Sequence, residues 1–502
     1  MAEILAPELP APPSAARARI TAVWSGNETE VVAARLAEAT LPAKESAAVE
    51  AQASALVSRV RERSANQSAV ESFMRQYDLS SEEGVLLMCV AEALLRVPDR
   101  LTTDKLIRDK LGEADWKKHL GASDSLFVNA STWGLMLTGH LVNLADATRA
   151  DAPGAFKRLI GQAGEPVIRL AVRQAMRIMG HQFVMGRTIE EALDRSAKGD
   201  NAKYRYSYDM LGEAAFTAPD AARYKKAYHD AILALGARGP FANLLDAPSI
   251  SVKLSALHPR YEVAKRERVH AELTPVVLEL AQLAQAQGIA LTIDAEEADR
   301  LELSLEVMDA VFTHPSLAGW NGFGLAVQAY QKRAPFVIDW LIETAKAAKR
   351  RWCVRLVKGA YWDSEIKRAQ ELGLAGYPVF TRKPNTDVSY LANARRMLDA
   401  GADVIYPQFA THNAHTIAAI HHLANGRPFE FQRLHGMGAD LYAEVVGPDK
   451  WNVPCRVYAP CGSHEDLLPY LVRRLLENGA NTSFVNRISD EKLPIHELIT
   501  DP

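Results

Sequence analysis

Residues 249–254 read Ser-Ile-Ser-Val-Lys-Leu, a short apolar segment that ends beside a lysine. Helical text follows at 266–285, and a second short segment, Ala-Leu-Thr-Ile-Asp, occupies 290–294. A run of this length that is rich in β-branched residues and bounded by helical text is typical of a buried strand in a parallel sheet. The two segments carry Lys253 and Asp294 at their ends. This strand–helix unit decides the fold because it recurs along the chain.

The unit recurs from about residue 203 onwards. The strand candidates are 204–210, 249–254, 290–294, 323–328, 353–357, 403–408, 429–434 and 455–459. Helical text follows each of them, at 221–235, 266–285, 300–312, 333–349, 389–399, 415–423, 438–445 and around Arg473. Such a series over about 280 residues matches the size of a (β/α)8 barrel. An open doubly wound sheet is the alternative, but Met210-Leu-Gly-Glu213 after the first strand is not the glycine-rich turn of that fold.

The chain before the barrel has a different pattern. Residues 1–20 are rich in Ala and Pro, and we expect a disordered N-terminus there. Residues 21–195 show apolar spacing of helical period and nearly no strand signal, which predicts a helical arm and an α-domain. The barrel is expected at 196–490, and 491–502 form a C-terminal tail or the start of a linker. The predicted fold class is therefore α/β, a (β/α)8 barrel preceded by an all-helical arm and α-domain.

Composition limits the function classes. The 502 residues are 48% hydrophobic and 24% charged, as in a soluble globular protein, and the net charge of −3 argues against binding to nucleic acid through overall basicity. Four cysteines show no spacing typical of zinc or of a disulfide framework, which favours a reducing compartment. No signal peptide is visible, and the apolar run 85–95 contains Glu92 and is too short to span a bilayer.

Polar or ionisable residues stand at every expected strand end, where barrel enzymes carry their chemistry. In chain order they are Glu213, Lys253, Asp294, Gln328, Arg355 with Lys358, Thr411 with His412 and Asn413, His435, and Tyr458. Such a set suits a large anionic cofactor, and Gly359, Ala360 and Trp362 offer close backbone approach and an aromatic face. A desolvated Lys253 or Lys358 could instead serve as a Schiff-base nucleophile. We expect no metal, although His412 and His415 are three residues apart.

A pair of adjacent arginines lies in the last helix. Residues 470–477 read Tyr-Leu-Val-Arg-Arg-Leu-Leu-Glu, within a segment that is apolar on nearly every side. Burying an unpaired guanidinium is costly, so Arg473 and Arg474 require an anion. Glu477, at helical spacing from both, can serve one of them. Either the pair forms a helix salt bridge with one arginine in solvent, or it binds a carboxylate or phosphate.

At residues 251–261, 294–297, 328–333, 355–365, 408–415 and 473–487 the chain resembles the proline dehydrogenase domain of the bacterial proline utilization A (PutA) flavoproteins. The resemblance implies FAD-dependent oxidation of L-proline to Δ1-pyrroline-5-carboxylate by hydride transfer to flavin N5. It also implies that electrons pass to a membrane quinone, from a cytoplasmic protein in peripheral contact with the inner membrane.

The resemblance assigns roles to individual residues. Arg473 and Arg474 would bind the proline carboxylate beside Lys253. Tyr458 would pack on the pyrrolidine ring, Leu434 would form part of the apolar wall, and Glu213 and Glu477 would hold the arginines in place. Asp294 would lie near substrate and flavin, and Arg355 near flavin N5. The remaining cofactor residues would be Gln328, Val357, Lys358, Gly359, Ala360 and Trp362 at the isoalloxazine and ribityl groups, and Thr381, Arg382, Lys383, Thr411, His412 and Asn413 at the pyrophosphate and adenosine.

Two departures from the family pattern shape the expectations. The Ala- and Pro-rich start does not resemble the ribbon-helix-helix segment of DNA-binding family members, so we expect no DNA binding. The chain ends at Pro502, without room for an aldehyde dehydrogenase domain, so we expect that second activity to be absent. The alternatives to a proline dehydrogenase are the Schiff-base lyase and a non-catalytic barrel that binds an anionic metabolite.

Overall fold

A computed structural model of the chain describes residues 13–65, 183–462, 487–488 and 493–502. The barrel belongs to a compact unit made of residues 1–60, 185–462 and 492–502. Residues 61–184 and 463–491 make up a second unit, of which few residues are described. Most of the predicted α-domain, and the arginine pair, lie outside the described residues. Within the described ranges, no helix is both long and apolar enough to cross a membrane.

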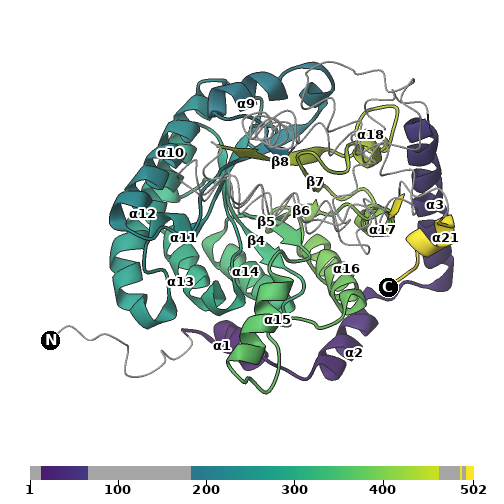
Figure 1. The fold of residues 1–502 in the computed structure, drawn as a ribbon, viewed down its shortest axis with the longest axis horizontal. Helices are drawn as coiled ribbons and strands as arrows, with labels where there is room; N and C mark the ends of the chain where they lie inside the picture. The colour runs from purple at the N-terminus through teal and green to yellow at the C-terminus, as the bar shows by residue number, and fades with distance from the viewer. Residues whose placement is uncertain (1–12, 66–182, 463–486, 489–492) are drawn as a thin grey trace, which may run out of the picture. The chain divides into compact units, whose positions relative to one another are not determined.

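A closed barrel of eight parallel strands forms the centre of the fold (Figure 1). The strands follow one another in sequence order around the barrel, and β1 pairs with β8 to close it. Their bounds are β1 Arg205–Met210, β2 Ser249–Val252, β3 Ala290–Ile293, β4 Phe323–Gln328, β5 Trp352–Val357, β6 Ile405–Ala410, β7 Glu430–Leu434 and β8 Cys455–Cys461. The predicted (β/α)8 barrel is confirmed, and the open doubly wound sheet is excluded.

Helices surround the barrel and connect its strands. The longer ones are α10 Ala218–Gly236, α12 Arg266–Ala286, α13 Leu301–Phe312, α14 Ala334–Ala348, α16 Lys383–Ala400 and α17 Ala414–Ala424. Shorter ones are α9 Ile189–Ser196, α11 Leu254–Leu257, α15 Trp362–Glu371, α18 Ala439–Ala443 and α21 Ile495–Leu498, with 3₁₀ turns at Gly199–Lys203, Val263–Lys265, Ala298–Arg300 and Pro315–Leu317. The helix predicted at 389–399 begins six residues earlier, at Lys383, because a proline is accommodated in the first turn.

The strands alternate between apolar residues that face the helices and polar residues that face the barrel interior. Arg355 on β5 donates hydrogen bonds to Ser207 on β1 and to Ser251 on β2, across the barrel. Strands that are not neighbours can exchange such bonds only through the interior. The outward positions, such as Tyr208 and Phe431, are buried beneath the helices. The interior of this barrel is therefore a hydrogen-bonded network and not an apolar core.

One carboxylate organises the polar layer deepest in the barrel. Glu430 accepts hydrogen bonds from Arg456 (Nε–Oε1 2.7 Å), Arg205 (Nη1–Oε2 3.1 Å), Gln408 (2.7 Å) and Gln432 (3.1 Å). Burial alone would raise the pKa of Glu430, but Arg456 and Arg205 hold it below its usual value. This layer closes the barrel floor beneath the upper layers.

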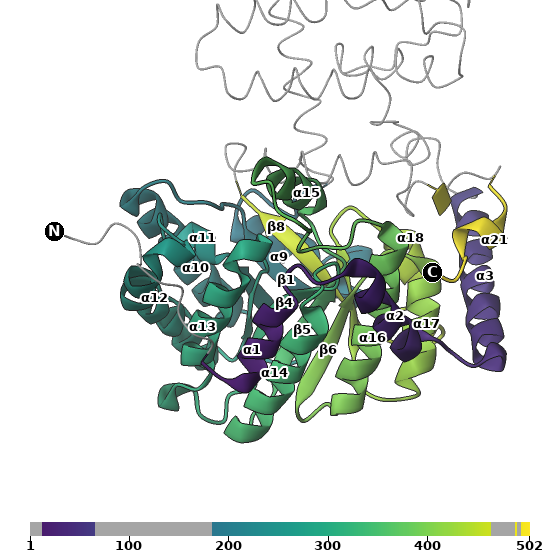
Figure 2. The same ribbon diagram turned by 90° about the horizontal axis from the view of Figure 1, so that it is seen from below.

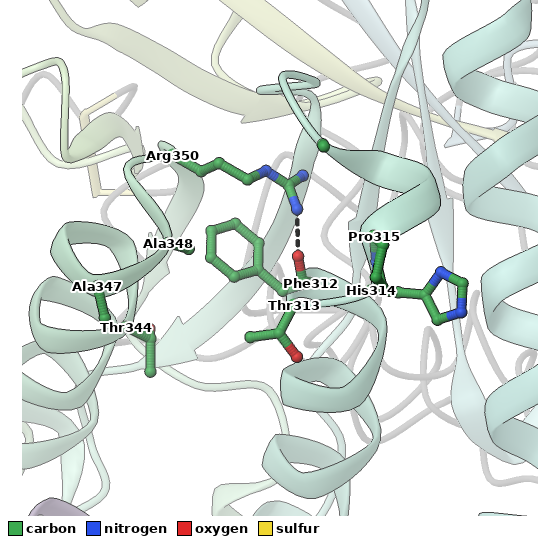
Figure 3. A pocket seen from close by; sticks show the side chains of 9 residues that line it. Phe312, Thr313, His314, Pro315, Thr344, Ala347, Ala348 and Arg350 are labelled. Atoms are coloured by element: carbon green, nitrogen blue, oxygen red, sulfur yellow. Dashed lines mark hydrogen bonds between the residues drawn. The ribbon is translucent and has the colours of Figure 1, made fainter.

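An aromatic cluster fills the space between the barrel and its outer helices near the start of β5. The Trp352 ring stacks on Phe312 at 3.7 Å between centroids and contacts Phe323 and Trp340. Figure 3 shows the neighbouring surface cavity of about 360 Å³, in which the Arg350 guanidinium lies over the Phe312 ring and donates to the Phe312 carbonyl. The donors that line this cavity already make hydrogen bonds within the protein, and the other lining groups are apolar.

An N-terminal arm, made of α1 Ala15–Ala22, α2 Glu28–Ala39 and α3 Ala43–Ala65, runs along the outside of the barrel helices (Figure 2). Here α1 packs on α14, and α2 packs on α16. The expectation of disorder up to residue 20 is wrong for residues 15–20. Arg17 is 1% exposed and pairs with Glu302 at 2.5 Å, while Ile20 is fully buried. Contacts to distant barrel helices order this segment, and local composition does not reveal them.

Candidate active site

Four side chains from four strands meet at the carboxyl-terminal end of the barrel around the ammonium of Lys253. Lys253 Nζ lies 2.9 Å from both carboxylate oxygens of Asp209, 3.1 Å from Asp294 Oδ2 and 3.1 Å from the Tyr458 hydroxyl. Tyr458 in turn donates to Asp294 Oδ2 at 2.6 Å. These residues come from the ends of β1, β2, β3 and β8, so the barrel register brings them together. Lys253, Asp294 and Tyr458 were expected here from the sequence.

Arg355 forms the layer directly below. Its guanidinium donates to Asp294 Oδ1 at 2.7 Å, to Gln432 at 2.6 Å and to the hydroxyl of Ser251 at 2.9 Å. Its Cζ atom lies 5.1 Å from the centre of the Tyr458 ring. Because partners hold its Nε and both terminal nitrogens, Arg355 is fixed before any ligand arrives.

The groups of this cluster have pKa values that keep their protonation states fixed at neutral pH. Burial would lower the pKa of Lys253, but Asp209, Tyr458 and Asp294 raise it well above its usual value. Burial would raise the pKa of Asp294, but Lys253 and Arg355 hold it below its usual value. Burial raises the pKa of the Tyr458 hydroxyl well above its usual value. At neutral pH the site therefore contains a fixed ammonium, a fixed guanidinium, an ionised Asp294 and a neutral phenol.

The ends of β4 and β5 form a wall beside this cluster. Gln328 is 4% exposed, and its side-chain amide joins the Glu296 carbonyl (2.8 Å) to the Ala360 backbone N–H (3.4 Å). Gly359 has a φ of +140°, and a Cβ there would lie 2.4 Å from the Tyr330 ring. Trp362 follows Val357 and Gly359 in the chain. Its indole Nε1 donates to the Phe380 carbonyl at 2.8 Å, yet the residue is 42% exposed. This wall presents the exposed Ala360 and a partly open indole face, which fits a flat aromatic ring.

Cations gather at the start of α16. Lys358 and Lys383 both pair with Asp387, Lys383 at 2.6 Å. Burial lowers the pKa of Lys358, although Asp387 opposes the shift. Arg382 and Thr381 are exposed next to them. Several cationic side chains beside the N-terminus of a helix are suited to binding a diphosphate group. Lys358 is not in the Lys253 cluster.

The segment after β6 forms the remaining expected part of the site. The Leu434 backbone N–H donates to His412 Nε2 at 3.1 Å, which brings the end of β7 to the loop after β6. Asn413 caps α17 by accepting from Thr416 N at 2.9 Å, and Thr411 is buried, with its carbonyl bound by Tyr442 at 2.8 Å. Asn413 thus has a structural duty in addition to the one expected of it.

Other expected residues are placed as follows. Glu213 lies partly buried in the loop after β1. Arg473, Arg474 and Glu477 lie outside the described residues. His415 lies inside α17, where burial lowers its pKa. Across the described ranges, no group of three or more His, Cys, Asp or Glu side chains is arranged to hold a metal ion.

Sequence reasoning missed Asp209 and Gln432. Asp209 is 1% exposed and holds Lys253 with both oxygens, and Gln432 orients Arg355. A signal was present, because Arg205, Ser207 and Asp209 alternate with tyrosines in β1, which marks an inward polar face. The acidic residue inside the strand was overlooked in favour of Glu213 in the loop that follows.

Comparisons with known proteins give a consistent result. A family described as "Proline dehydrogenase" matches residues 192–487, and one described as "Proline utilization A proline dehydrogenase N-terminal domain" matches residues 14–61. The bifunctional protein PutA of Klebsiella aerogenes is 54% identical over 98% of this chain and 38% of its own length. PutA of Rhizobium meliloti is 53% identical over 98% of the chain and 40% of its length. The chain thus spans well under half the length of these relatives.

Solved structures agree. A crystal structure of a variant of Bradyrhizobium japonicum proline utilization A has a TM-score of 0.73 and 47% identity, covering 99% of this chain and 49% of that one.

The expectation that the chain binds no DNA is contradicted. A family described as "DNA-binding domain of Proline dehydrogenase" matches residues 69–183. Neither the first residues nor the net charge of the whole chain reveals this domain, because an average charge does not describe one segment. Most of this match lies outside the described residues.

Proposed function

The chain belongs to the proline dehydrogenase family, in the form found in proline utilization A proteins, and we propose that its barrel catalyses FAD-dependent oxidation of L-proline to Δ1-pyrroline-5-carboxylate. The observation that carries this proposal is the cluster of Lys253, Asp294, Tyr458 and Arg355 at the carboxyl-terminal mouth of the barrel. It combines fixed positive charge with an aromatic face, as a small cyclic amino acid requires.

The residues at the ends of β4 and β5 fit FAD. Gly359 packs directly against the Tyr330 ring, the neighbouring Ala360 is exposed, the Trp362 indole is partly open, and Lys358, Arg382 and Lys383 supply positive charge for phosphates. We assign Gln328, Arg355, Val357, Gly359, Ala360 and Trp362 to the flavin ring side, and Lys358, Thr381, Arg382, Lys383, Thr411, His412 and Asn413 to the diphosphate and adenosine side. FAD, when bound, would supply a hydride acceptor at N5.

The protein's own contribution is binding, orientation and charge. Lys253 would attract the proline carboxylate, together with Arg473 and Arg474, and Tyr458 would place its ring against the pyrrolidine, with Leu434 nearby. Lys253 and Arg355 favour the neutral form of the substrate nitrogen because they are positively charged. Asp294, which stays ionised, offsets one of these two charges. None of these four groups needs to exchange a proton during the reaction.

The Schiff-base alternative receives less support. A lysine nucleophile must lose its proton, and the pKa of Lys253 is raised by its carboxylate neighbours. Lys358 has a lowered pKa but is engaged by Asp387. We also propose, from the family resemblance, that electrons pass to a membrane quinone from a cytoplasmic protein in peripheral contact with the inner membrane.

Substitution of the arginine pair tests the substrate assignment. Arg473→Met or Arg474→Met should raise the KM for L-proline by about tenfold or more, the scale of one lost charged hydrogen bond. The FAD content of the purified variants should stay near that of the wild type. Variants that lose FAD but keep their proline affinity would show that the pair serves the cofactor instead.

A further inference from the structure

A carboxylate of the N-terminal arm reaches the cofactor side of the barrel. Glu28 begins α2, and its partners Thr381 and Asn385 stand 353 and 357 positions later in the chain. Its oxygens accept from the Thr381 backbone N–H at 2.9 and 3.1 Å, from the Thr381 hydroxyl at 3.0 Å and from Asn385 Nδ2 at 2.6 Å. These contacts meet the segment assigned above to the FAD diphosphate.

The segment itself lacks an internal anchor at this point. Phe380 is held by the barrel, since its N–H donates to the Tyr330 carbonyl at 2.8 Å and its carbonyl accepts from Trp362. One residue later, the hydrogen bonds of Thr381 within the described ranges all go to Glu28. The N-cap residue of α16, Arg382, makes no side-chain capping bond. Glu28 therefore supplies the anionic partner that a helix start favours, from a different helix.

This support has an energetic consequence for ligand binding. Thr381, Arg382 and Lys383 are exposed, so burial does little to restrain them. If a segment must be ordered at the moment of binding, the ordering free energy is subtracted from the affinity. A segment that is already fixed avoids this loss. The charge balance also permits an anion, because Lys358, Lys383 and Arg382 outnumber Asp387 and Glu28.

The same two helices carry a second contact, which separates local from general effects. Near the other end of α2, Glu38 accepts from Arg396 of α16 at 2.9 Å and pairs with Arg35 at 3.0 Å. Arg396 also pairs with Asp339 of α14 at 2.7 Å. Loss of Glu38 would loosen the arm without touching Thr381.

We propose that Glu28 is a positioning residue of the cofactor site: it fixes Thr381–Lys383 so that this segment is ready to receive the FAD diphosphate, and the N-terminal arm is thereby a working part of the flavin site. The inference rests on the proposed FAD-dependent function. It adds a residue to the site that touches neither substrate nor flavin and acts through Thr381.

The test uses the complete chain freed of flavin, with Glu28→Ala, Glu28→Gln and the matched control Glu38→Ala. FAD affinity is measured by quenching of flavin fluorescence, and backbone order by hydrogen exchange of the peptide over 377–385. Glu28→Ala should weaken FAD about tenfold and speed exchange in this peptide, Glu28→Gln should lie between it and the wild type, and Glu38→Ala should change affinity less than about twofold. The KM for proline at saturating FAD should not change in any variant.

Equal weakening by Glu28→Ala and Glu38→Ala would overturn the proposal, because the arm would then act only as a general brace. Tighter FAD binding by Glu28→Ala would also overturn it, because Glu28 would be a competitor of the phosphates. A wild type that binds no FAD would instead refute the proposed function, and the exchange comparison would still decide whether Glu28 orders the segment. If Glu28→Ala does not fold, the isosteric Glu28→Gln decides by the same two readouts.

Discussion

The ammonium of Lys253 is held at 2.9 Å by both oxygens of Asp209, a carboxylate from the neighbouring strand that is 1% exposed. This pair lies next to Asp294 and Tyr458, so it fixes a positive charge at the place where the substrate carboxylate is proposed to bind. Asp209 thereby couples the charge of the site to the pairing of β1 with β2.

Replacement of Asp209 by Asn should weaken both folding and substrate binding. The variant keeps the shape of the side chain but removes its negative charge, so the pKa of Lys253 falls toward its usual value. As the pH is raised into the alkaline range, the KM for proline should therefore begin to rise at a lower pH than in the wild type. The unfolding free energy should fall by about 2 kcal/mol in urea titrations. Asp230→Asn, which breaks an exposed pair with Lys226, is the control and should change stability by less than about 0.5 kcal/mol. Equal values for the two variants would show that the buried pair does not matter.

The buried Glu430 predicts a specific pH dependence of stability. Its folded pKa lies below the unfolded value, so its contribution is present above about pH 4.5 and is lost as pH falls through the folded pKa. Glu430→Gln turns an amide N–H₂ toward donors from Arg456, Arg205 and Gln408 and should cost about 3–5 kcal/mol at pH 7. The difference from the wild type should shrink below pH 4.5 in chemical unfolding. A difference that does not depend on pH would contradict the assigned ionisation.

Gly359 is expected to tolerate no side chain. Gly359→Ala places a methyl group 2.4 Å from the Tyr330 ring at a φ of +140°, and the resulting strain should lower stability by about 1–3 kcal/mol and reduce the bound FAD. Gly373 is the matched control, because it also has a positive φ (+62°) but no atom within 4 Å of its Cβ position. Calorimetry and the flavin-to-protein absorbance ratio measure the two effects. Normal flavin content in Gly359→Ala would remove this residue from the proposed cofactor wall.

Arg355 should not be replaceable by lysine. An ammonium cannot reach Asp294, Gln432 and Ser251 at once, so Arg355→Lys should lower kcat for proline by about 100-fold and shift the absorption spectrum of the bound flavin. Arg351→Lys, directly before the start of the same strand, should leave both properties nearly unchanged. If the two variants show the same turnover, the role assigned to Arg355 is wrong.

Sequence patterns predicted the barrel well because most strands are short apolar runs followed by helical text. They also located Lys253, Asp294, Arg355 and Tyr458, since strand ends can be counted along the chain. The alternation in β1 marks Asp209 as an inward residue, but its pairing with Lys253 depends on the register between two strands and cannot be read from the sequence. Arg17 and Glu28 were missed for the same reason, since their contacts are made with residues hundreds of positions away.

The visible spectrum of the purified chain decides whether the barrel oxidises L-proline with FAD. The protein as isolated, or after reconstitution with FAD, should show the absorption of oxidised flavin, and L-proline added without oxygen should bleach it as the flavin is reduced. Δ1-Pyrroline-5-carboxylate should appear in an amount equal to the flavin bleached. A chain that binds FAD but keeps its oxidised spectrum in the presence of excess L-proline would contradict the account.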